Sequence, residues 1–432
     1  MPPLPSAPSV HAEASKPPPA EGATLPFAGR CVVLVHPAWH SCGSHQVFVS
    51  QAQAYRALGA KVVSVAVADF PGAAAGSRAH RAYLAASQDL IADERHFAGM
   101  PRHRLASPQF LLAAEKWLHG NAAEMLCAIA RSSDVPAAVR SLPRIDLIHC
   151  NHFFCMPAAL ALRGTRPCKI VLDTHDLQAR QFALRAQSGW RLAPRARYDD
   201  MLTLELAQMA EADLLVHLND EEALTLQELL PQKHHELIYP TIKPVPAGPG
   251  GPDIIIVASA NYPNFLSVAW FLEAVHPLAP EVRVKIIGNI DGAVRARAPA
   301  LFKEHAGLFL GRVADLDAVY ANAAAILLPT TSGHGISVKT IEALSSGVPL
   351  IATREAFRGM AIDPAALANV TLLSDAAQFA AAMRRPATAP PAAAHAATDT
   401  RRLYERHFAF GAYTGRIAEA IAPLLPADAS AD

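Results

Sequence analysis

The chain has 432 residues, enough for two or three domains, and 51% of them are hydrophobic, which is typical of a globular protein. Lysine plus arginine and aspartate plus glutamate both number 38, so no overall positive field favours nucleic-acid binding. No uninterrupted apolar run is long enough to span a bilayer. The six cysteines are widely spaced, which predicts reduced, mostly buried thiols of a cytoplasmic protein.

Residues 1–27 are rich in proline, alanine and serine and lack a continuous apolar core. That composition predicts a disordered tail and argues against a signal peptide. Residues 28–243 then alternate short apolar runs with helical stretches, the pattern of a doubly wound α/β domain. We expect a helix over 44–58 that ends at Gly59 in a left-handed cap. Strands are expected at 32–35, 61–67, 145–148, 169–172 and 213–216.

The segment 240–252 is rich in proline and glycine and cannot form a helix or a central strand, so it is expected to link two domains. A second doubly wound domain is predicted over 253–398, and a final helix over 399–425. The strands of this second domain are expected at 253–257, 282–287, 309–311, 324–328 and 350–353. Because ligands of such domains bind at the carboxyl ends of the strands, we expect the domains to face each other across a cleft.

The most informative stretch is 331–349, where an apolar strand is followed by a glycine-rich turn and a short helix. Gly347 and Pro349 are expected to end that helix. Free backbone N–H groups and the positive end of the helix dipole make such a turn a binding site for phosphate. Gly335, Lys339 and Glu342 are spaced i, i+4, i+7, which predicts that they share one helix face.

These features resemble the GT-B glycosyltransferases, and most closely the retaining transferases of family 4, the group 1 type, in a subgroup that builds bacterial polysaccharides. The most specific part is 329–353, and 173–176, 211–216, 261–264 and 270–272 support it. The resemblance implies two Rossmann-like domains facing across a cleft, with the last helix returning to the first domain. The first domain would hold the acceptor and the second the nucleotide-sugar donor.

The resemblance implies that Glu342 holds the donor's ribose hydroxyls and that Lys339 neutralises its diphosphate, with His175 as the third catalytic residue. An ordinary first-turn glutamate and a surface lysine are the alternative interpretations. The residues implied to bind the donor are Gly333, His334, Gly335, Ile336, Lys339, Glu342, Asn261 and Asn264.

Two departures from the family pattern concern charge. His334 stands where the commonest family version has a second glutamate, and it could contact donor hydroxyls or be a solvated loop residue. The turn 258–265 lacks the Arg/Lys pair that many members carry. Lys339, helix N-termini and backbone amides would therefore have to neutralise the charge of the donor's phosphates.

On the acceptor side, residues 41–45 follow the first strand and resemble the family's glycine loop, with a plain turn capped by Ser44 as the alternative. The residues expected to line this side, besides His175 at a strand end, are Cys42, Gly43, Ser44 and Asp176. A structural hydrogen bond between His175 and Asp176 is the alternative role for that histidine.

We expect neither a metal nor a cofactor. Asp315-Leu316-Asp317 has the Asp-x-Asp pattern of a cation site, but Asp315 is placed to cap a helix. The cluster 149–155 contains histidine and cysteine, yet its spacing fits no tetrahedral zinc site.

Two basic stretches lie in the first domain, 95–104 and 185–197, the second with Trp190. Arginine and tryptophan together suit an anionic membrane, which would place the protein peripherally at the inner face of the cell membrane. Exposed loops with ordinary charges are the alternative.

The function expected from these features is a retaining, metal-independent hexosyltransferase acting on a glycan or lipid-linked acceptor in surface-polysaccharide or glycolipid synthesis. The alternative is a non-catalytic GT-B-like subunit that binds a carbohydrate or a partner. A sugar-nucleotide epimerase with the same two-domain fold fits the glycine turn less well.

Overall fold

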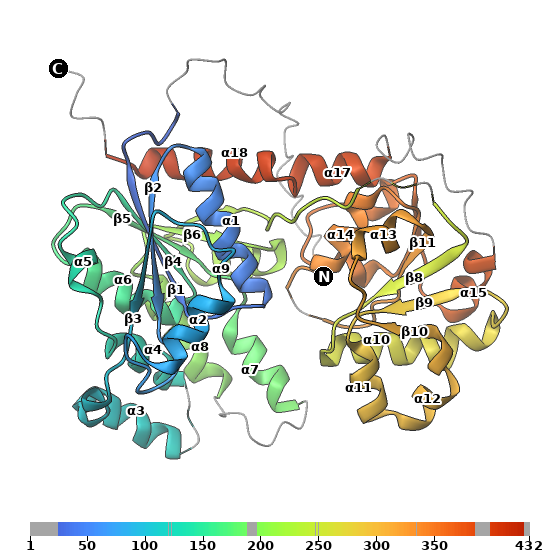
Figure 1. Cartoon of the computed structure of the whole chain (residues 1–432), viewed down its shortest axis with the longest axis horizontal. Helices are drawn as coiled ribbons and strands as arrows, with labels where there is room; N and C mark the ends of the chain where they lie inside the picture. Colours follow the sequence, from blue (N-terminus) through green and yellow to red (C-terminus); the bar gives the residue numbers. More distant parts are fainter. Residues whose placement is uncertain are drawn as a thin grey trace, which may run out of the picture.

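The computed structural model describes residues 25–119, 121, 123–187, 197–246, 248, 250–333, 335–384 and 398–426. His334, most of the 1–27 tail, and Trp190, Arg191 and Arg195 of the second basic stretch lie outside the described residues. Two parallel sheets, each with helices on both faces, form two domains that lie side by side (Figure 1). This architecture confirms the expected pair of Rossmann-like domains.

Within the described residues, the sheet of the first domain has the order β3-β2-β1-β4-β5-β6-β7, with all neighbours parallel. Its strands are β1 (Cys31–Pro37), β2 (Lys61–Val67), β3 (Glu94–Ala98), β4 (Leu147–Asn151), β5 (Lys169–Asp173), β6 (Leu214–His217) and β7 (His234–Leu237). Its helices are α1 (Gly43–Ala57), α2 (Arg78–Ala86), α3 (Pro108–Leu118), α4 (Ala123–Arg131), α5 (Ala137–Arg140), α6 (Met156–Arg163), α7 (Gln178–Gln187), α8 (Tyr198–Met209) and α9 (Asp220–Leu229).

The sheet of the second domain has the order β10-β9-β8-β11-β12-β13 in the described part of the chain, again parallel throughout. Its strands are β8 (Asp253–Val257), β9 (Val284–Ile287), β10 (Phe309–Gly311), β11 (Ala323–Leu328), β12 (Leu350–Ala352) and β13 (Val370–Leu372). Its helices are α10 (Tyr262–Trp270), α11 (Ile290–Arg297), α12 (Pro299–Glu304), α13 (Leu316–Ala321), α14 (Val338–Ser346) and α15 (Ala376–Arg384).

The strands predicted from apolar runs are present, but sequence reasoning missed the edge strands β3, β7 and β13. Their burial is partial, with exposed or half-buried residues in each. An edge strand is not covered on all sides, so its sequence need not be a continuous apolar run. The segment 95–104 is therefore not a basic loop: it begins in β3, and Phe97 and Met100 are buried.

The core follows from the alternation of side chains along each strand. In β1, Val33 and Val35 pack into an apolar cluster on one face of the sheet, and Val32 and Leu34 pack into a second cluster on the other. The second domain repeats this arrangement with clusters on both faces of its sheet. None of the helices in the described part of the chain combines the length and apolar character that a membrane crossing requires.

The last helical stretch is two helices, α17 (Asp399–His407) and α18 (Phe410–Ile421), and not the single helix expected. Leu403, Tyr404 and Phe408 pack into the core of the second domain, whereas Tyr413 and Ile417 pack with the core of the first. Figure 1 shows the pair running along both domains. The helix break is needed because the two apolar faces must meet two separate cores. The return of the last helix to the first domain is confirmed.

Replacing Ile417 with alanine tests this attachment. Ile417 is 1% exposed in the cluster that contains Phe48 and Tyr55, so the cavity should destabilise the first domain by about 2–5 kcal/mol. Urea unfolding followed by circular dichroism measures the change. Arg416→Ala, at an exposed neighbouring position, is the control and should change stability by less than about 0.5 kcal/mol. Equal midpoints for the two variants would contradict the packing role of α18.

Candidate functional site

The glycine turn, the segment between the end of β11 at Leu328 and the start of α14 at Val338, lies at the carboxyl end of β11. The Ser337 side chain accepts a hydrogen bond from the backbone N–H of Thr340, at 3.3 Å, and caps the helix. Gly347 ends the helix with a φ of 72°, as predicted. Because α14 begins at Val338, Gly335 belongs to the turn and not to the helix face it was expected to share. Ile336 packs against the core of the second domain.

Lys339 and Glu342 form an ion pair one helical turn apart. The Lys339 Nζ lies 3.0 Å and 2.8 Å from the two carboxylate oxygens of Glu342. The buried Tyr320 hydroxyl donates a third hydrogen bond to this carboxylate, at 3.1 Å. The Glu342 side chain is 20% exposed, so it is oriented by its partners and still reachable by a ligand. Without a ligand, the carboxylate of Glu342 balances the positive charge of Lys339.

Asn261 and Asn264 shape the start of α10. The Asn261 side chain accepts a hydrogen bond from the Asn264 backbone N–H at 2.8 Å, which is an N-cap. The Asn264 amide donates to the backbone oxygen of Ser259 at 3.0 Å. At the carboxyl end of β8, Asn261 is exposed and Asn264 is half-buried. They sit on the same edge of the sheet as the glycine turn, where the donor residues were expected.

In the first domain, a cavity of about 510 Å³ opens beside the loop between β1 and α1. Ser44 does not cap α1, because the N-cap position is Cys42 and its side chain makes no capping bond. Instead, the Ser44 hydroxyl lies 3.2 Å from the Nε2 atom of His152. The cavity is lined by Ala38, Trp39, His40, Cys42, Gly43, Ser44, Asp69, His152, Asp176, Gln178 and Gln181.

His175 lies beneath this cavity and does not line it. It is 2% exposed, and its Nε2 atom is 2.8 Å from the Oδ1 atom of Asn151. Its backbone N–H donates to Asp173, so the bond to Asp176 considered from the sequence is replaced by other partners. Its ring stacks at 3.9 Å on the ring of His152, which does reach the cavity.

His152 is the functional candidate that sequence reasoning missed, because the cluster around it was considered only as a metal site. The sequence did contain a signal for His152: it directly follows β4, whose neighbour in the sheet is β5, and His175 follows β5. Residues at the carboxyl ends of neighbouring parallel strands are placed to contact a ligand. His152 and His175 both have positive φ angles, 64° and 58°. Such strain persists only where surrounding contacts over-determine the conformation, and it is common at ligand sites.

A buried polar network supports these two histidines. Gln51 donates to Asp173 at 2.9 Å and accepts from Asn151 at 2.8 Å. The Tyr55 hydroxyl lies 2.8 Å from His149. Burial holds the pKa of His175 well below its ordinary value, so the ring is neutral. The network thus fixes ring orientation below the cavity without placing positive charge there.

The two domains meet at the glycine turn. A side chain at Gly335, which has a φ of 61°, would come within 2.7 Å of the Asp176 carboxylate of the first domain. The backbone N–H of Asp220 donates to the Gly359 carbonyl at 3.2 Å. The donor side and the acceptor side expected from the sequence therefore adjoin, and Gly335 is required for the close approach.

Within the described residues, no group of histidine, cysteine and carboxylate side chains is arranged to hold a metal ion. Asp315 caps α13 by accepting from the backbone N–H of Ala318 at 2.9 Å, as predicted, and Asp317 lies 3.5 Å from Lys243. The Asp-x-Asp pattern is thus used for local structure.

Buried titratable groups predict that stability is greatest near pH 6.5. Histidines held neutral contribute stability that increases as pH rises from about 3 to 6.5, because in this range the unfolded chain binds more protons. Buried carboxyls with raised pKa values lose stability from about pH 4 up to 7 or 8, because the folded chain binds more protons there. Burial lowers the pKa to about 4 for His36 and about 3 for His149, His152 and His217, and raises it to about 7 for Asp173 and Glu222 and about 8 for Glu205.

These histidines outnumber the carboxyls, so the free energy of unfolding should rise up to pH 6.5 and fall between 6.5 and 8. Urea unfolding at half-unit pH steps measures it. Asp173→Asn should flatten the fall above pH 6.5. A stability that rises steadily to pH 8 would contradict the buried, neutral state of these carboxyls.

Comparison with known proteins agrees with the fold. Residues 251–388 match the family model of the group 1 glycosyl transferases. A search of curated proteins found no match.

Solved structures match nearly the whole chain. Sucrose-phosphate synthase from Thermosynechococcus elongatus is 18% identical, with 91% of this chain and 99% of that chain covered and a TM-score of 0.60. Anabaena HepE in complex with UDP and glucose is 14% identical, with 90% and 99% covered and a TM-score of 0.56. The pneumococcal O-GlcNAc transferase GtfA in complex with UDP and GlcNAc is 11% identical, with 91% and 99% covered and a TM-score of 0.59. The chain therefore has the GT-B fold, and its second domain matches the group 1 glycosyltransferases.

Proposed function

We propose that this protein is a glycosyltransferase that moves a hexose from a nucleotide-sugar donor to a hydroxyl of a glycan or lipid-linked acceptor, with retention and without a metal. Its role would be in bacterial surface-polysaccharide or glycolipid synthesis. The observation that carries the proposal is the contact between the two domains: the glycine turn of the matched second domain adjoins Asp176 at the cavity of the first.

On the donor side, Glu342 is the proposed partner of the ribose diol. A carboxylate accepts from both hydroxyls of a diol at once, and such charge-assisted bonds are about twice as strong as neutral ones. Donor binding would then release Lys339 from Glu342 to the diphosphate, where the leaving group develops negative charge. Backbone N–H groups of the turn would add to this stabilisation without reorganising during the reaction.

On the acceptor side, the cavity offers an aromatic wall and two carboxylates. Trp39 packs edge-on against His152, with ring centroids 4.9 Å apart. Asp69 and Asp176 also line the cavity, and burial raises the pKa of Asp69. Aromatic surface and hydrogen-bond acceptors suit a sugar with free hydroxyls. The acceptor hydroxyl would enter here and meet the donor at the glycine turn.

UDP-sugars are the first donors to test, because HepE and GtfA, which share the fold, were solved with UDP. Glu342→Ala should weaken UDP-glucose binding at least about tenfold, since the loss of hydrogen bonds to a charged group costs about 1.5–3 kcal/mol. Isothermal titration calorimetry gives both dissociation constants. Glu304→Ala, whose side chain is 70% exposed, is the control and should bind as the unmodified protein does.

Equal affinities for the two variants would remove Glu342 from the donor site. Catalysis is tested separately by the release of UDP from donor sugars, with and without candidate acceptors. A protein that binds UDP-sugars but never releases UDP would instead be the non-catalytic subunit considered above.

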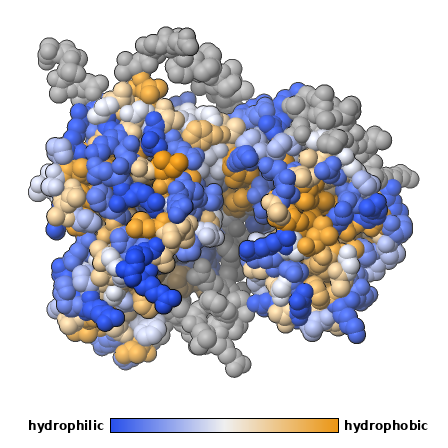
Figure 2. Space-filling view, in the orientation of Figure 1, coloured by the Kyte–Doolittle hydropathy of each residue, from blue (hydrophilic) through white to orange (hydrophobic). Residues whose placement is uncertain are grey.

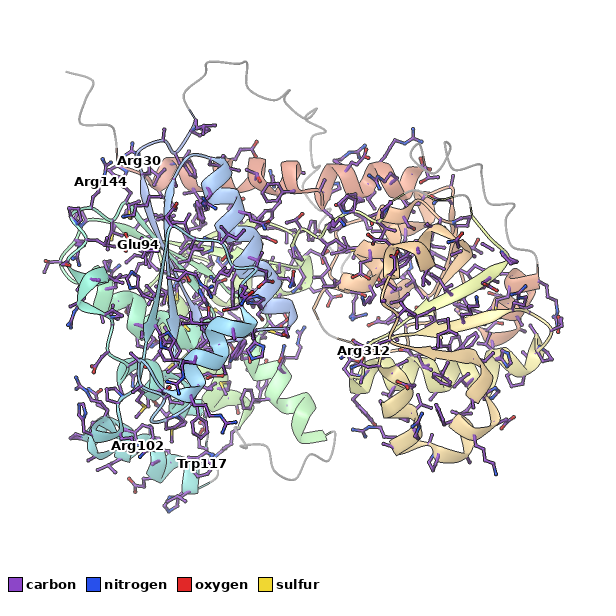
Figure 3. The ribbon with its side chains drawn as sticks, viewed as in Figure 1. Arg30, Glu94, Arg102, Trp117, Arg144 and Arg312 are labelled. Carbon is purple, nitrogen blue, oxygen red and sulfur yellow. The ribbon has the colours of Figure 1, made fainter. Side chains whose placement is uncertain are left out.

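Peripheral contact with an anionic membrane is proposed for α3. Its large side chains face solvent: Leu111 is 55% exposed, Trp117 48% and Leu118 78%. The preceding turn (Arg102–Ala106) adds positive charge beside them. Figure 3 shows Arg102 and Trp117 at the same end of the first domain, and Figure 2 shows apolar and polar residues intermixed there. Apolar and basic side chains together favour an anionic bilayer surface.

Leu118→Glu should reduce co-sedimentation with phosphatidylglycerol vesicles several-fold at low salt, because it places negative charge in the apolar face. Leu224→Glu, on α9 and 61% exposed, is the matched control and should leave binding unchanged. Sedimentation of the unmodified protein no greater than its background without vesicles would exclude the membrane contact.

A further inference from the structure

Two buried polar atoms flank the glycine turn without a hydrogen-bond partner. In the described part of the chain, neither the Ser332 hydroxyl oxygen nor the Nε atom of Arg358 has one. An unpaired buried donor costs about 1–3 kcal/mol, so most such groups in proteins are satisfied by protein, water or ligand. Both residues adjoin Gly333: Ser332 precedes it in the chain, and the Arg358 guanidinium lies where a side chain at Gly333 would project. Two unpaired polar atoms beside the same glycine indicate a position that a ligand completes.

Arg358 reaches the turn from the loop that follows β12. It comes directly after a short helical turn (Arg354–Phe357), and its Nη1 atom donates to the Glu355 backbone oxygen at 3.1 Å. A side chain at Gly333 would overlap the guanidinium of Arg358. The guanidinium therefore lies directly against the turn's backbone, and a side chain at position 333 would displace it from this contact.

The charge of Arg358 is not balanced by a close carboxylate. Among the described residues no Asp or Glu oxygen lies within 4.0 Å of its guanidinium. Burial lowers its pKa, and the charges of Glu355 and Glu221 oppose that effect. An arginine remains protonated in proteins, so the turn carries a half-buried cation with spare donors.

Lys339 differs in this respect. Its ammonium contacts both oxygens of Glu342 and must give up that pair before it serves an anion. Arg358 has no such partner to lose, and its planar fork matches phosphate and carboxylate oxygens. The turn 258–265 has no cation, so Arg358 is the residue that supplies one beside the glycines.

We propose that Arg358, together with the Ser332 hydroxyl, binds an anionic group of the donor at the glycine turn. The proposal rests on the function proposed above and names a residue that the sequence did not indicate. The anion is either the donor's diphosphate or the carboxylate of an acidic sugar, since both present oxygens that a guanidinium binds.

The test compares Arg358→Gln with Arg354→Gln, a control four residues earlier whose side chain is 72% exposed. Calorimetric titration with inorganic pyrophosphate, UDP, UDP-glucose and UDP-glucuronic acid gives the affinities of the full-length proteins. Arg358→Gln should weaken binding about tenfold or more, and Arg354→Gln should not. Melting temperatures are measured first. If Arg358→Gln is unfolded, Arg358→Lys and Ser332→Ala take its place, and each should lose part of the affinity.

The pattern across ligands separates the two anions. Weaker binding of pyrophosphate and of every nucleotide assigns Arg358 to the diphosphate. Weaker binding of UDP-glucuronic acid alone assigns it to a sugar carboxylate. Unchanged affinity for all four ligands overturns the proposal while the glycosyltransferase function stands. If the unmodified protein binds none of the four, both the anion site and the proposed donor fall.

Discussion

The attachment of the carboxyl-terminal helices to both domains is the constraint on which the site depends. Each domain has its own core, and the linker 240–252 alone would leave the domains free to separate. Thr241 of this linker donates to the Phe408 carbonyl at 2.7 Å, and the Tyr404 hydroxyl donates to the Ile242 carbonyl at 2.7 Å. These bonds fasten the linker to the helix pair at the point where the chain passes between domains.

This attachment holds the two domains so that Gly335 of the second approaches Asp176 of the first. The carboxyl ends of two parallel sheets face each other only when the domains are held in register. The first domain then contributes Asp176 and the cavity, and the second contributes the glycine turn. Neither domain alone contains both the cavity and the glycine turn on which the proposed function depends.

The two halves of the site differ in electrostatics. His152, which lines the cavity, and His175 beneath it are neutral because burial disfavours their charged forms. The glycine turn instead brings a lysine paired with glutamate and an arginine without a close carboxylate. Uncharged histidines at the cavity and cations at the glycine turn fit the proposed transfer of a sugar from an anionic carrier to a hydroxyl.

The sequence by itself determined the elements with strong periodicity. β2, β8 and β10 have the predicted bounds because their residues form bounded, strand-like runs. The caps at Gly347 and Asp315 were predictable because capping depends on residues close in sequence. The edge strands β3, β7 and β13 were not, because partial exposure weakens the apolar signal that marks a strand.

Only the tertiary structure decided which of the stacked pair His152 and His175 reaches the cavity, which side chains pair with Lys339 and Glu342, and which cation lies at the glycine turn. Arg358 is 25 residues from Gly333 in the chain, and the parallel pairing of β11 with β12 brings them together. His152 and His175 are neighbours through the pairing of β4 with β5. Such contacts follow from strand order and domain packing, which a local pattern of residues does not contain.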